Sequence, residues 1–235
     1  MEKLNKIYSG KAKDIYETDD PSFAIMEHRD DLTALNGEKR GSFNEKGIIN
    51  HEITGLIFSF LESKGIKTHF VRDLNSRESL VKKVSIIPLE VIVRNVAAGS
   101  FSKKYGVAEG APLKCTVLEF SLKNDALGDP MLSESHAVAL GIASQKELSE
   151  IGEAACRING ALTELFSSIG LKLVDFKVEF GRDDEGKLLL ADEITPDSCR
   201  LWDLESGEKL DKDRFRRSLG GVEEAYREVW RRLKE

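Results

Sequence analysis

Residues 144–194 constrain the fold most, because a long helix and two strands follow one another there without a break. Ser144 and Glu147 have the spacing typical of a helix start, and apolar residues recur at helical spacing as far as Ile169. Gly170 ends this predicted helix. A hairpin follows, with its strand, turn and returning strand predicted at Leu171–Phe180, Asp183–Gly186 and Leu188–Ile194.

Short strands dominate the first eighty residues, and the second half of the chain mixes helices with strands. Because these elements do not alternate as regular βαβ units, the sequence predicts an α+β fold. The pattern changes near Lys83, so we expect a small β-rich lobe over residues 1–83 and a larger mixed lobe over residues 84–235. The other predicted strands are Lys6–Tyr16, Phe23–Glu27, Leu80–Val84 and Leu89–Arg94, and the other predicted helices cover residues 49–61 and 222–233.

Charge and cysteine content argue against several classes of protein. The 235 residues carry a net charge of −6, which disfavours binding to nucleic acid or to an anionic membrane surface. Three separated cysteines without a CxxC pair disfavour a zinc site or a disulfide framework. The first residues lack the apolar core of a signal peptide. We expect a cytoplasmic protein that acts on small molecules and forms a homo-oligomer, for instance a dimer.

The predicted hairpin is the most informative chemical feature. Asp175, Lys177 and Glu179 line one face of a strand whose other face is apolar. A two-residue or four-residue loop would place Glu179 opposite Asp192, with Glu193 on the other face. Two carboxylates in that position repel each other unless a cation such as magnesium lies between them. The alternative is an exposed hairpin with solvated charges, and a three-residue loop would also break the pairing.

A lysine pair near the N-terminus is a second candidate site. If Lys6–Tyr16 is one strand, Lys11 and Lys13 point to the same face, where they match the charge of a triphosphate. Gly10 would let the backbone approach a phosphate closely. The segment is neither a P-loop nor a GxGxxG motif. The alternative is a pair of lysines on a solvated strand.

Two further segments combine charge with exposed backbone. Glu90 and Arg94 share one face of a predicted strand, and Ala97-Ala98-Gly99-Ser100 follows with free N–H groups and a hydroxyl, a combination suited to a phosphate. The alternative is a structural pair between Glu90 and Arg94. The loop 192–203 is dense in polar groups and is placed for ligand binding, with a capped surface turn as the alternative.

Several segments together resemble the SAICAR synthetase (phosphoribosylaminoimidazole-succinocarboxamide synthase) family. The resemblance runs from about residue 6 to the C-terminus, and it departs from commoner members at Asn36, where aspartate is frequent, and at Gly128, which is often histidine. The two long matching segments are Ile86–Ser100 and Leu173–Gly181, and the shorter ones are Tyr8–Lys13, Lys123–Asp125 with Asp129-Pro130, and Asp211–Arg216.

The resemblance implies an ATP-grasp-like, two-lobed architecture in which the N-terminal lobe covers ATP. Its implied nucleotide contacts are Gly10, Lys11, Ala12 and Lys13 at the phosphates and the backbone near Lys82 at the adenine. It implies magnesium at Glu179 and Asp192. The implied ribotide contacts are Glu90, Arg94, Ser100, Asp175, Lys177 and Arg200, and the segments of Asp197 and Lys123 are plausible for L-aspartate.

The implied reaction joins L-aspartate to the carboxylate of carboxyaminoimidazole ribotide (CAIR), giving SAICAR, ADP and phosphate in de novo purine biosynthesis. ATP would convert the carboxylate into an acyl phosphate, which the aspartate amine attacks. Magnesium and Lys177 would offset the negative charge, and Asp175 is a candidate general base. Two alternatives are a related ligase or small-molecule kinase with another substrate, and a nucleotide-binding regulatory protein without turnover.

Overall fold

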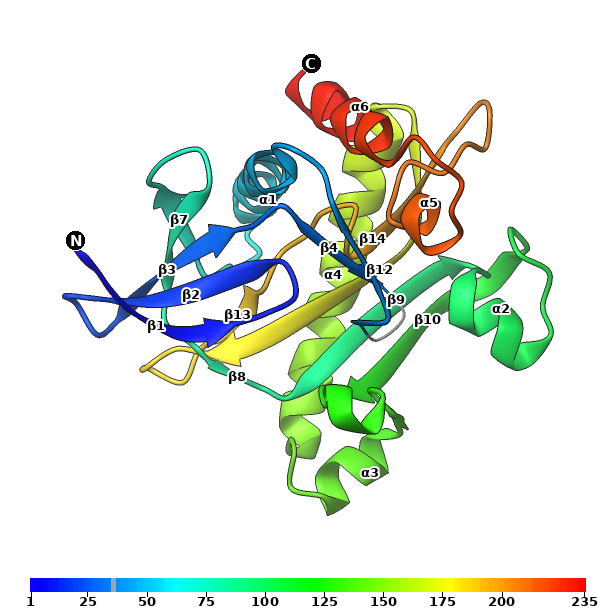
Figure 1. Cartoon of the computed structure of the whole chain (residues 1–235). Coiled ribbons are helices and arrows are strands. Elements are labelled where there is room, and N and C mark those ends of the chain that lie inside the picture. Colours follow the sequence, from blue (N-terminus) through cyan, green and yellow to red (C-terminus); the bar gives the residue numbers. More distant parts are fainter. Residues whose placement is uncertain (35–36) are drawn as a thin grey trace.

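The computed structural model describes residues 1–34 and 37–235, and it shows a mixed α+β fold (Figure 1). The family departure expected at Asn36 lies outside the described residues. In the described part of the chain, no helix is both long and apolar enough to cross a membrane. Cys115 and Cys156 are exposed free thiols, and Cys199 is a buried one.

An antiparallel five-stranded sheet occupies the N-terminal part of the chain, in the order β1-β2-β3-β7-β6. Helix α1 (Lys46–Ser63) packs against β3 and β6 of this sheet. The strands are β1 (Lys3–Ser9), β2 (Lys13–Thr18), β3 (Phe23–His28), β6 (Phe70–Asp73) and β7 (Glu78–Lys82), and a separate pair contains β4 (Asp31–Ala34) and β5 (Lys39–Ser42).

A seven-stranded sheet forms the centre of the molecule around the long strand β12 (Leu171–Arg182). β12 pairs with β9, β13, β14 and β8, and helix α4 (Gln145–Ser168) packs against β12 and β9. The other strands are β8 (Ser85–Ile86), β9 (Leu89–Val96), β10 (Pro112–Leu122), β11 (Met131–Leu132), β13 (Leu188–Ala191) and β14 (Cys199–Asp203).

Short helices and one C-terminal helix complete the fold. These are α2 (Gly99–Tyr105), the 3-10 turn η2 (Asp125–Leu127), α3 (Glu134–Ala139), α5 (Asp213–Arg216) and α6 (Val222–Lys234). Apolar side chains of α1, α4, α6 and the central sheet form one continuous core. The N-terminal sheet adds a small cluster of Ala24, Met26 and Val81, with Ile15 against it.

The helix and hairpin predicted from residues 144–194 are present. Ser144 and Glu147 cap α4 reciprocally, with backbone-to-side-chain distances of 2.8 and 3.2 Å. Phe176, Val178 and Phe180 of β12 enter the core, as the alternation predicts. Two predicted strands differ in ways that affect the site. The predicted strand Lys6–Tyr16 is two strands with a turn at residues 10–12, and the returning strand ends at Ala191 rather than Ile194.

Candidate active site

The hairpin of β12 and β13 has a different register from the one predicted. Glu179 pairs with Ala191 instead of Asp192, because the loop contains five residues, 183–187. The Asp183 carboxylate holds this loop by accepting hydrogen bonds from two backbone N–H groups, at 3.1 and 2.8 Å. In a regular strand, this shift of one residue would turn the Asp192 side chain to the opposite face from Glu179.

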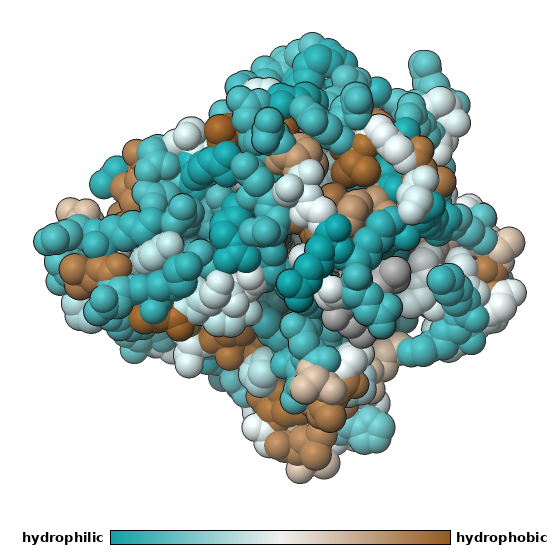
Figure 2. Space-filling model, viewed as in Figure 1, coloured by the Kyte–Doolittle hydropathy of each residue, from teal (hydrophilic) through white to brown (hydrophobic). Residues whose placement is uncertain are grey.

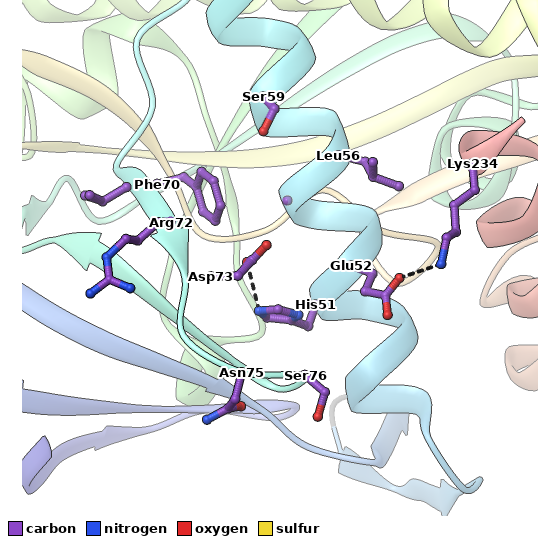
Figure 3. A pocket seen from close by; sticks show the side chains of 12 residues that line it. His51, Glu52, Leu56, Ser59, Phe70, Arg72, Asp73, Asn75, Ser76 and Lys234 are labelled. Carbon is purple, nitrogen blue, oxygen red and sulfur yellow. Dashed lines mark hydrogen bonds and ion pairs between the residues drawn. The ribbon is translucent and has the colours of Figure 1, made fainter.

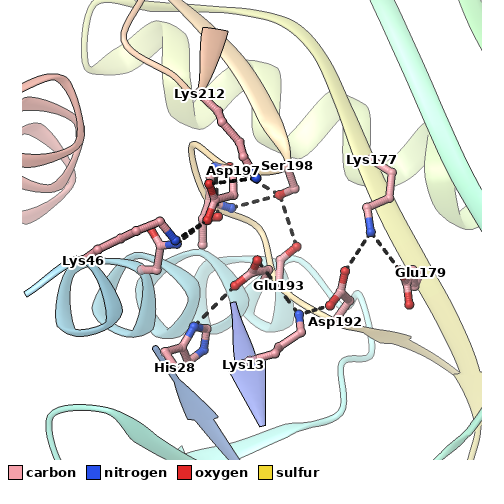
Figure 4. A network of polar contacts seen from close by, with 12 residues as sticks. Lys13, His28, Lys46, Lys177, Glu179, Asp192, Glu193, Asp197, Ser198 and Lys212 are labelled. Atoms are coloured by element: carbon pink, nitrogen blue, oxygen red, sulfur yellow. Dashed lines mark hydrogen bonds and ion pairs between the residues drawn. The ribbon is translucent and has the colours of Figure 1, made fainter. Parts of the chain in front are cut away.

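The backbone conformation of Asp192 brings its side chain back toward Glu179. Asp192 follows the end of β13 and has φ +65°, a left-handed conformation that non-glycine residues seldom adopt. Lys177 Nζ lies 2.8 Å from Glu179 Oε1 and 3.0 Å from Asp192 Oδ2 (Figure 4). The two carboxylates therefore share one neighbour, as expected for one site, but a turn rather than strand pairing produces the arrangement.

Three lysines surround these two carboxylates. Lys13 forms an ion pair with Asp192, Lys123 forms one with Glu179, and Lys177 contacts both acids. Burial raises the pKa of Glu179, but the Lys177 and Lys123 ammonium groups outweigh it and lower that pKa to about 2. Burial likewise lowers the pKa of Lys177, and the carboxylates around it raise that pKa above its usual value. The site therefore contains both an ionised carboxylate, Glu179, and a charged ammonium group, Lys177, at neutral pH.

Glu179 and Asp192 are the two carboxylates that a divalent cation would use here. Their side chains are only 4% and 10% exposed. Within residues 1–34 and 37–235, no group of three or more His, Cys, Asp or Glu side chains could hold a metal. Magnesium commonly binds one or two protein carboxylates and takes its other oxygens from phosphates and water. The residues therefore fit magnesium that arrives with a phosphate ligand.

The turn between β1 and β2 places its two lysines apart. The prediction that Lys11 and Lys13 share one strand face is wrong, because residues 10–12 form the turn and only Lys13 belongs to β2. Lys11 Nζ lies 2.6 Å from Asp125 Oδ1, whereas Lys13 reaches Asp192. Both ammonium groups nevertheless point from the N-terminal sheet toward the central part of the molecule.

Arg29 holds the same turn from the end of β3. Its Nη2 donates to the carbonyl oxygen of Gly10 at 2.8 Å, and its backbone N–H donates to that of Ala12, also at 2.8 Å. The Gly10 N–H donates back across the turn to the Lys13 carbonyl at 2.8 Å. The segment expected to lie at phosphates is therefore a braced turn rather than a loose loop.

Glu193 is part of the site, although its predicted position on the opposite strand face suggested a lesser role. Its Oε1 lies 3.9 Å from Lys13 Nζ, and its Oε2 lies 3.3 Å from Nδ1 of the buried His28 (Figure 4). Burial raises the pKa of Glu193, but the Lys13 ammonium outweighs it and lowers that pKa to about 2. Lys13 therefore has an anionic group on either side.

A second cluster contains the arginines predicted at a phosphate. Asp175 of β12 pairs with Arg94 of β9 and with Arg200 of β14, so the three side chains meet. Nη1 of Arg94 and Nη1 of Arg200 each lie 2.9 Å from Asp175 Oδ2, and Arg94 Nη2 lies 3.3 Å from Ser100 Oγ. Glu90 lies 3.7 Å from Lys177, and among the described residues it forms no ion pair with Arg94.

Two acids in this second cluster were missed from the sequence. Glu119 contacts Arg94, and Asp213 contacts Arg200. For Glu119 a signal was available, because it is a charged residue inside the apolar run Leu118-Glu119-Phe120. Asp213 lies in the matching segment 211–216, but nothing local indicates its partner.

Two other predicted residues have contacts that bear on their assignment. The backbone N–H of Lys82 donates to the His69 carbonyl oxygen at 2.7 Å, so this donor is already used within the sheet. Asp197 is surrounded by donors from Lys46, Asn50, Tyr226 and Lys212, and its side chain is only 6% exposed. Its contacts are those of a structural residue.

A cavity of about 570 Å³ lies away from both clusters, between α1 and the β6–β7 hairpin (Figure 3). His51, Phe70, Asp73 and Lys234 are among the residues that line it, and no residue of the two clusters does. His51 Nε2 lies 3.0 Å from Asp73 Oδ1 in its wall. The candidate site is therefore defined by converging charges and not by this cavity.

This α+β fold gathers three lysines, two arginines and several buried carboxylates around strand β12, an arrangement that suits an enzyme with anionic ligands. The model of the family described as SAICAR synthetase matches residues 6–233. The chain belongs to this family, and it is therefore a ligase of purine biosynthesis.

Similar proteins cover nearly the whole chain. A phosphoribosylaminoimidazole-succinocarboxamide synthase of Fusobacterium nucleatum is 57% identical over 235 residues, which is 100% of this chain and 99% of the relative. The crystal structure of the synthase from Ehrlichia chaffeensis is 49% identical with a TM-score of 0.96, covering 98% of both chains. A SAICAR synthetase (Type-2) in complex with ADP is 44% identical with a TM-score of 0.93, covering 96% of both chains.

Proposed function

We propose that this chain joins L-aspartate to the carboxylate of CAIR with ATP, giving SAICAR, ADP and phosphate. The observation that carries the proposal is the convergence of Lys177, Glu179 and Asp192 at one point of the central sheet. This point lies on the same strand as Asp175, which joins the two arginines. One strand therefore connects a site suited to a magnesium-bound triphosphate with a site suited to a phosphorylated substrate.

The nucleotide would lie against the braced β1–β2 turn. Gly10 and Ala12 would bring the backbone close to its phosphates, and the ammonium groups of Lys11 and Lys13 would contact them. Glu179 and Asp192 would hold magnesium, which supplies positive charge at the transferring phosphoryl group. The backbone near Lys82 would contact the adenine. The solved relative with bound ADP supports nucleotide binding by this fold.

The ribotide would bind along β12 and β9. Arg94, Arg200 and Ser100 would hold its phosphate, since a guanidinium can donate two parallel hydrogen bonds to phosphate oxygens. Glu90 and Asp175 would contact the remaining polar groups of the ribotide. Among the described residues, Arg94 forms no pair with Glu90, so the structural alternative for that strand lacks its expected contact.

The chemistry would begin with phosphorylation of the ribotide carboxylate, because an acyl phosphate gives the amine a leaving group to displace. Lys177 would offset the charge that gathers between the carboxylate and the phosphoryl group. The carboxylate of Asp175 already accepts hydrogen bonds from two guanidinium groups, so it has buried partners of its own. We therefore favour a binding role for Asp175 over the general-base role.

L-Aspartate would lie near Lys123. The Lys123 side chain is 34% exposed and lies beside Glu179, so it can contact a ligand carboxylate next to the transferring phosphoryl group. Asp197 would act indirectly, because its oxygens already accept hydrogen bonds from buried donors. The proposed ligand contact at Asp197 would require these bonds to break.

We also propose the ATP-grasp-like, two-lobed arrangement, with a nucleotide-covering lobe over residues 1–83, a cytoplasmic location and a homo-oligomer. The separation of the five-stranded sheet from the seven-stranded sheet supports the first of these. Figure 2 shows an apolar area at the lower end of the molecule, over α3, where Val138 and Leu140 are 42% and 64% exposed. Exposed apolar groups of this kind are typical of contact surfaces and support self-association.

The main test is phosphate release from purified protein with ATP, CAIR and L-aspartate, leaving out each in turn. We expect ADP and phosphate only when all three are present, with SAICAR as the product. A stable phosphorylated product without aspartate would instead indicate a small-molecule kinase. AMP and pyrophosphate as products would reject the acyl-phosphate route, and binding of ATP without any turnover would indicate a regulatory protein.

The metal assignment has its own test. Glu179→Gln and Asp192→Asn should each cut turnover severely, and a higher magnesium concentration should restore part of it by mass action. Direct titration of magnesium into the ADP complex should show weaker binding in both variants. Glu185→Gln in the exposed hairpin loop is the matched control and should behave as wild type. Unchanged magnesium binding in both site variants would contradict the assignment.

A further inference from the structure

Each arginine of the second cluster is held at its Nε atom by its own buried carboxylate. Arg94 Nε lies 2.7 Å from Glu119 Oε2, and Arg200 Nε lies 3.0 Å from Asp213 Oδ2. The side chains of Glu119 and Asp213 are only 6% and 1% exposed. Asp175 lies between the arginines and accepts from Nη1 of both. The two guanidinium groups are thus arranged in the same way, although they come from different strands.

This arrangement leaves the Nη2 side of both guanidinium groups directed to one short segment. Arg94 Nη2 lies near Ser100 Oγ at 3.3 Å. Arg200 Nη2 lies against Gly99, where an added β-carbon would collide with the guanidinium. The donors that remain for a ligand therefore meet at Gly99 and Ser100, in the segment that the sequence suggests for a phosphate.

We propose that Glu119 and Asp213 are positioning residues that orient Arg94 and Arg200 for the phosphate of the ribotide. This inference rests on the proposed function, because it concerns the same substrate. A free arginine side chain samples many rotamers, and a charged hydrogen bond at Nε fixes the plane of the guanidinium. Two guanidinium groups that are already fixed can donate to phosphate oxygens without the loss of side-chain entropy that would otherwise accompany binding.

The charges around Asp213 support this role. Its other oxygen accepts from Arg216 Nη1 at 2.6 Å, and its backbone N–H donates to Asp211 at 2.7 Å, so the carboxylate is fixed from the α5 side. Burial raises the pKa of Asp213, but the Arg200 guanidinium outweighs it and lowers that pKa to about 2. Asp213 therefore stays ionised at neutral pH and keeps its hold on Arg200.

Positioning and simple charge attraction predict opposite results. Glu119→Gln and Asp213→Asn each remove one negative charge beside the arginines. If net charge governed binding, both variants would bind a phosphate ligand more tightly than wild type. If Glu119 and Asp213 position the arginines, both variants should bind it about tenfold more weakly, as expected when a hydrogen bond to a charged group is lost.

The experiment measures ribose 5-phosphate and ADP binding by calorimetry, together with KM for CAIR and ATP and with kcat. We expect weaker ribose 5-phosphate binding and a higher KM for CAIR, with ADP binding and the KM for ATP within about twofold of wild type. Arg94→Lys shows how much binding is lost when the guanidinium group itself is removed, and it serves as the reference for the other variants. Glu223→Gln is the matched control, because Glu223 also contacts the Nε atom of an arginine, Arg227, outside the cluster.

Glu119→Asp and Asp213→Glu keep the charge and move the carboxylate by one methylene, so they test the geometry if the first variants fold poorly. They should also weaken ribose 5-phosphate binding. Tighter or unchanged binding in the folded variants, or an equal loss for ADP, would overturn the proposal. The binding assay needs no turnover, so a wild-type protein that binds ribose 5-phosphate but forms no SAICAR would refute only the proposed function.

Discussion

Replacing Asp197 by asparagine should destabilise the protein by about 3–5 kcal/mol, the usual cost of removing one partner from a buried ion pair. The Asp197 carboxylate lies 2.5 Å from Nζ of the fully buried Lys46 and 3.4 Å from Nζ of Lys212. It also accepts hydrogen bonds from Asn50 and Tyr226, each at 2.8 Å. Asparagine has nearly the same shape, but it removes the negative charge between the buried ammonium group of Lys46 and the ammonium group of Lys212.

The size of this loss is large for a protein of 235 residues. Free energies of unfolding are typically about 5–15 kcal/mol, so the substitution would remove a substantial fraction. A loss of 1 kcal/mol lowers the melting temperature of a protein of this size by about 2–4 °C, so a decrease of roughly 6–20 °C is expected. Burial raises the pKa of Asp197, but the Lys212 and Lys46 ammonium groups lower it below its usual range.

That direction gives the pH dependence of the effect. Because the folded pKa of Asp197 lies below its unfolded value, the stabilisation is present above about pH 4 and is lost as the pH falls through the folded pKa. The difference between wild type and Asp197→Asn should therefore be full at pH 7 and smaller in strong acid.

Urea denaturation followed by circular dichroism measures this effect at pH 7. The midpoint should fall in Asp197→Asn, with little change in the dependence on urea concentration. Glu164→Gln is the control, because Glu164 pairs with Lys64 at the surface and should contribute less than about 1 kcal/mol. Stability within 1 kcal/mol of wild type, together with a raised KM for L-aspartate, would refute the structural role and favour a ligand contact.

Two further substitutions test local features of the site and core. Gly99→Ala should weaken ribose 5-phosphate binding measured by calorimetry, because Gly99 has φ +54° and a β-carbon there would collide with Arg200. Gly65→Ala is the control, because Gly65 has φ +78° with open space around it. It should lose about 1 kcal/mol of stability in urea denaturation without any change in binding. Burial lowers the pKa of His69 from 6.5 to about 3, so its contribution to stability is present above pH 6.5 and falls as the pH decreases, with a loss of about 2 kcal/mol at pH 5. Denaturation of His69→Leu at pH 5 and pH 7 should lack this difference of about 2 kcal/mol. The same pH dependence in the variant as in wild type would contradict the assignment.

Local patterns were sufficient to predict much of the structure. The cap of α4 and the glycine that follows it depend on neighbouring residues only, so their sequence pattern indicated the helix. The alternation in β12 placed Asp175, Lys177 and Glu179 against polar partners and the phenylalanines in the core for the same reason. These features follow from the repeat of the helix and of the strand, which appears in the sequence as the spacing of apolar residues.

The arrangement of the site depended on contacts that no local pattern contains. The hydrogen bonds of Asp183 hold a loop of five residues. This loop is one residue longer than the four-residue loop that would pair Glu179 with Asp192, so Glu179 pairs with Ala191 instead. The left-handed backbone of Asp192 then brought the two carboxylates back together. Neither feature can be derived from the alternation, because a loop of different length preserves the same pattern in both strands.

The sequence by itself thus determined the α+β elements, the polar face of β12 and, through its long signatures, the family. Only the tertiary structure decided which charged groups share a partner. Glu119 and Asp213 reach their arginines from a neighbouring strand and from a helix, and Asp197 is buried by donors from α1 and α6. Charged side chains look alike in a sequence, and their roles follow from burial and from partners that folding alone brings within hydrogen-bond distance.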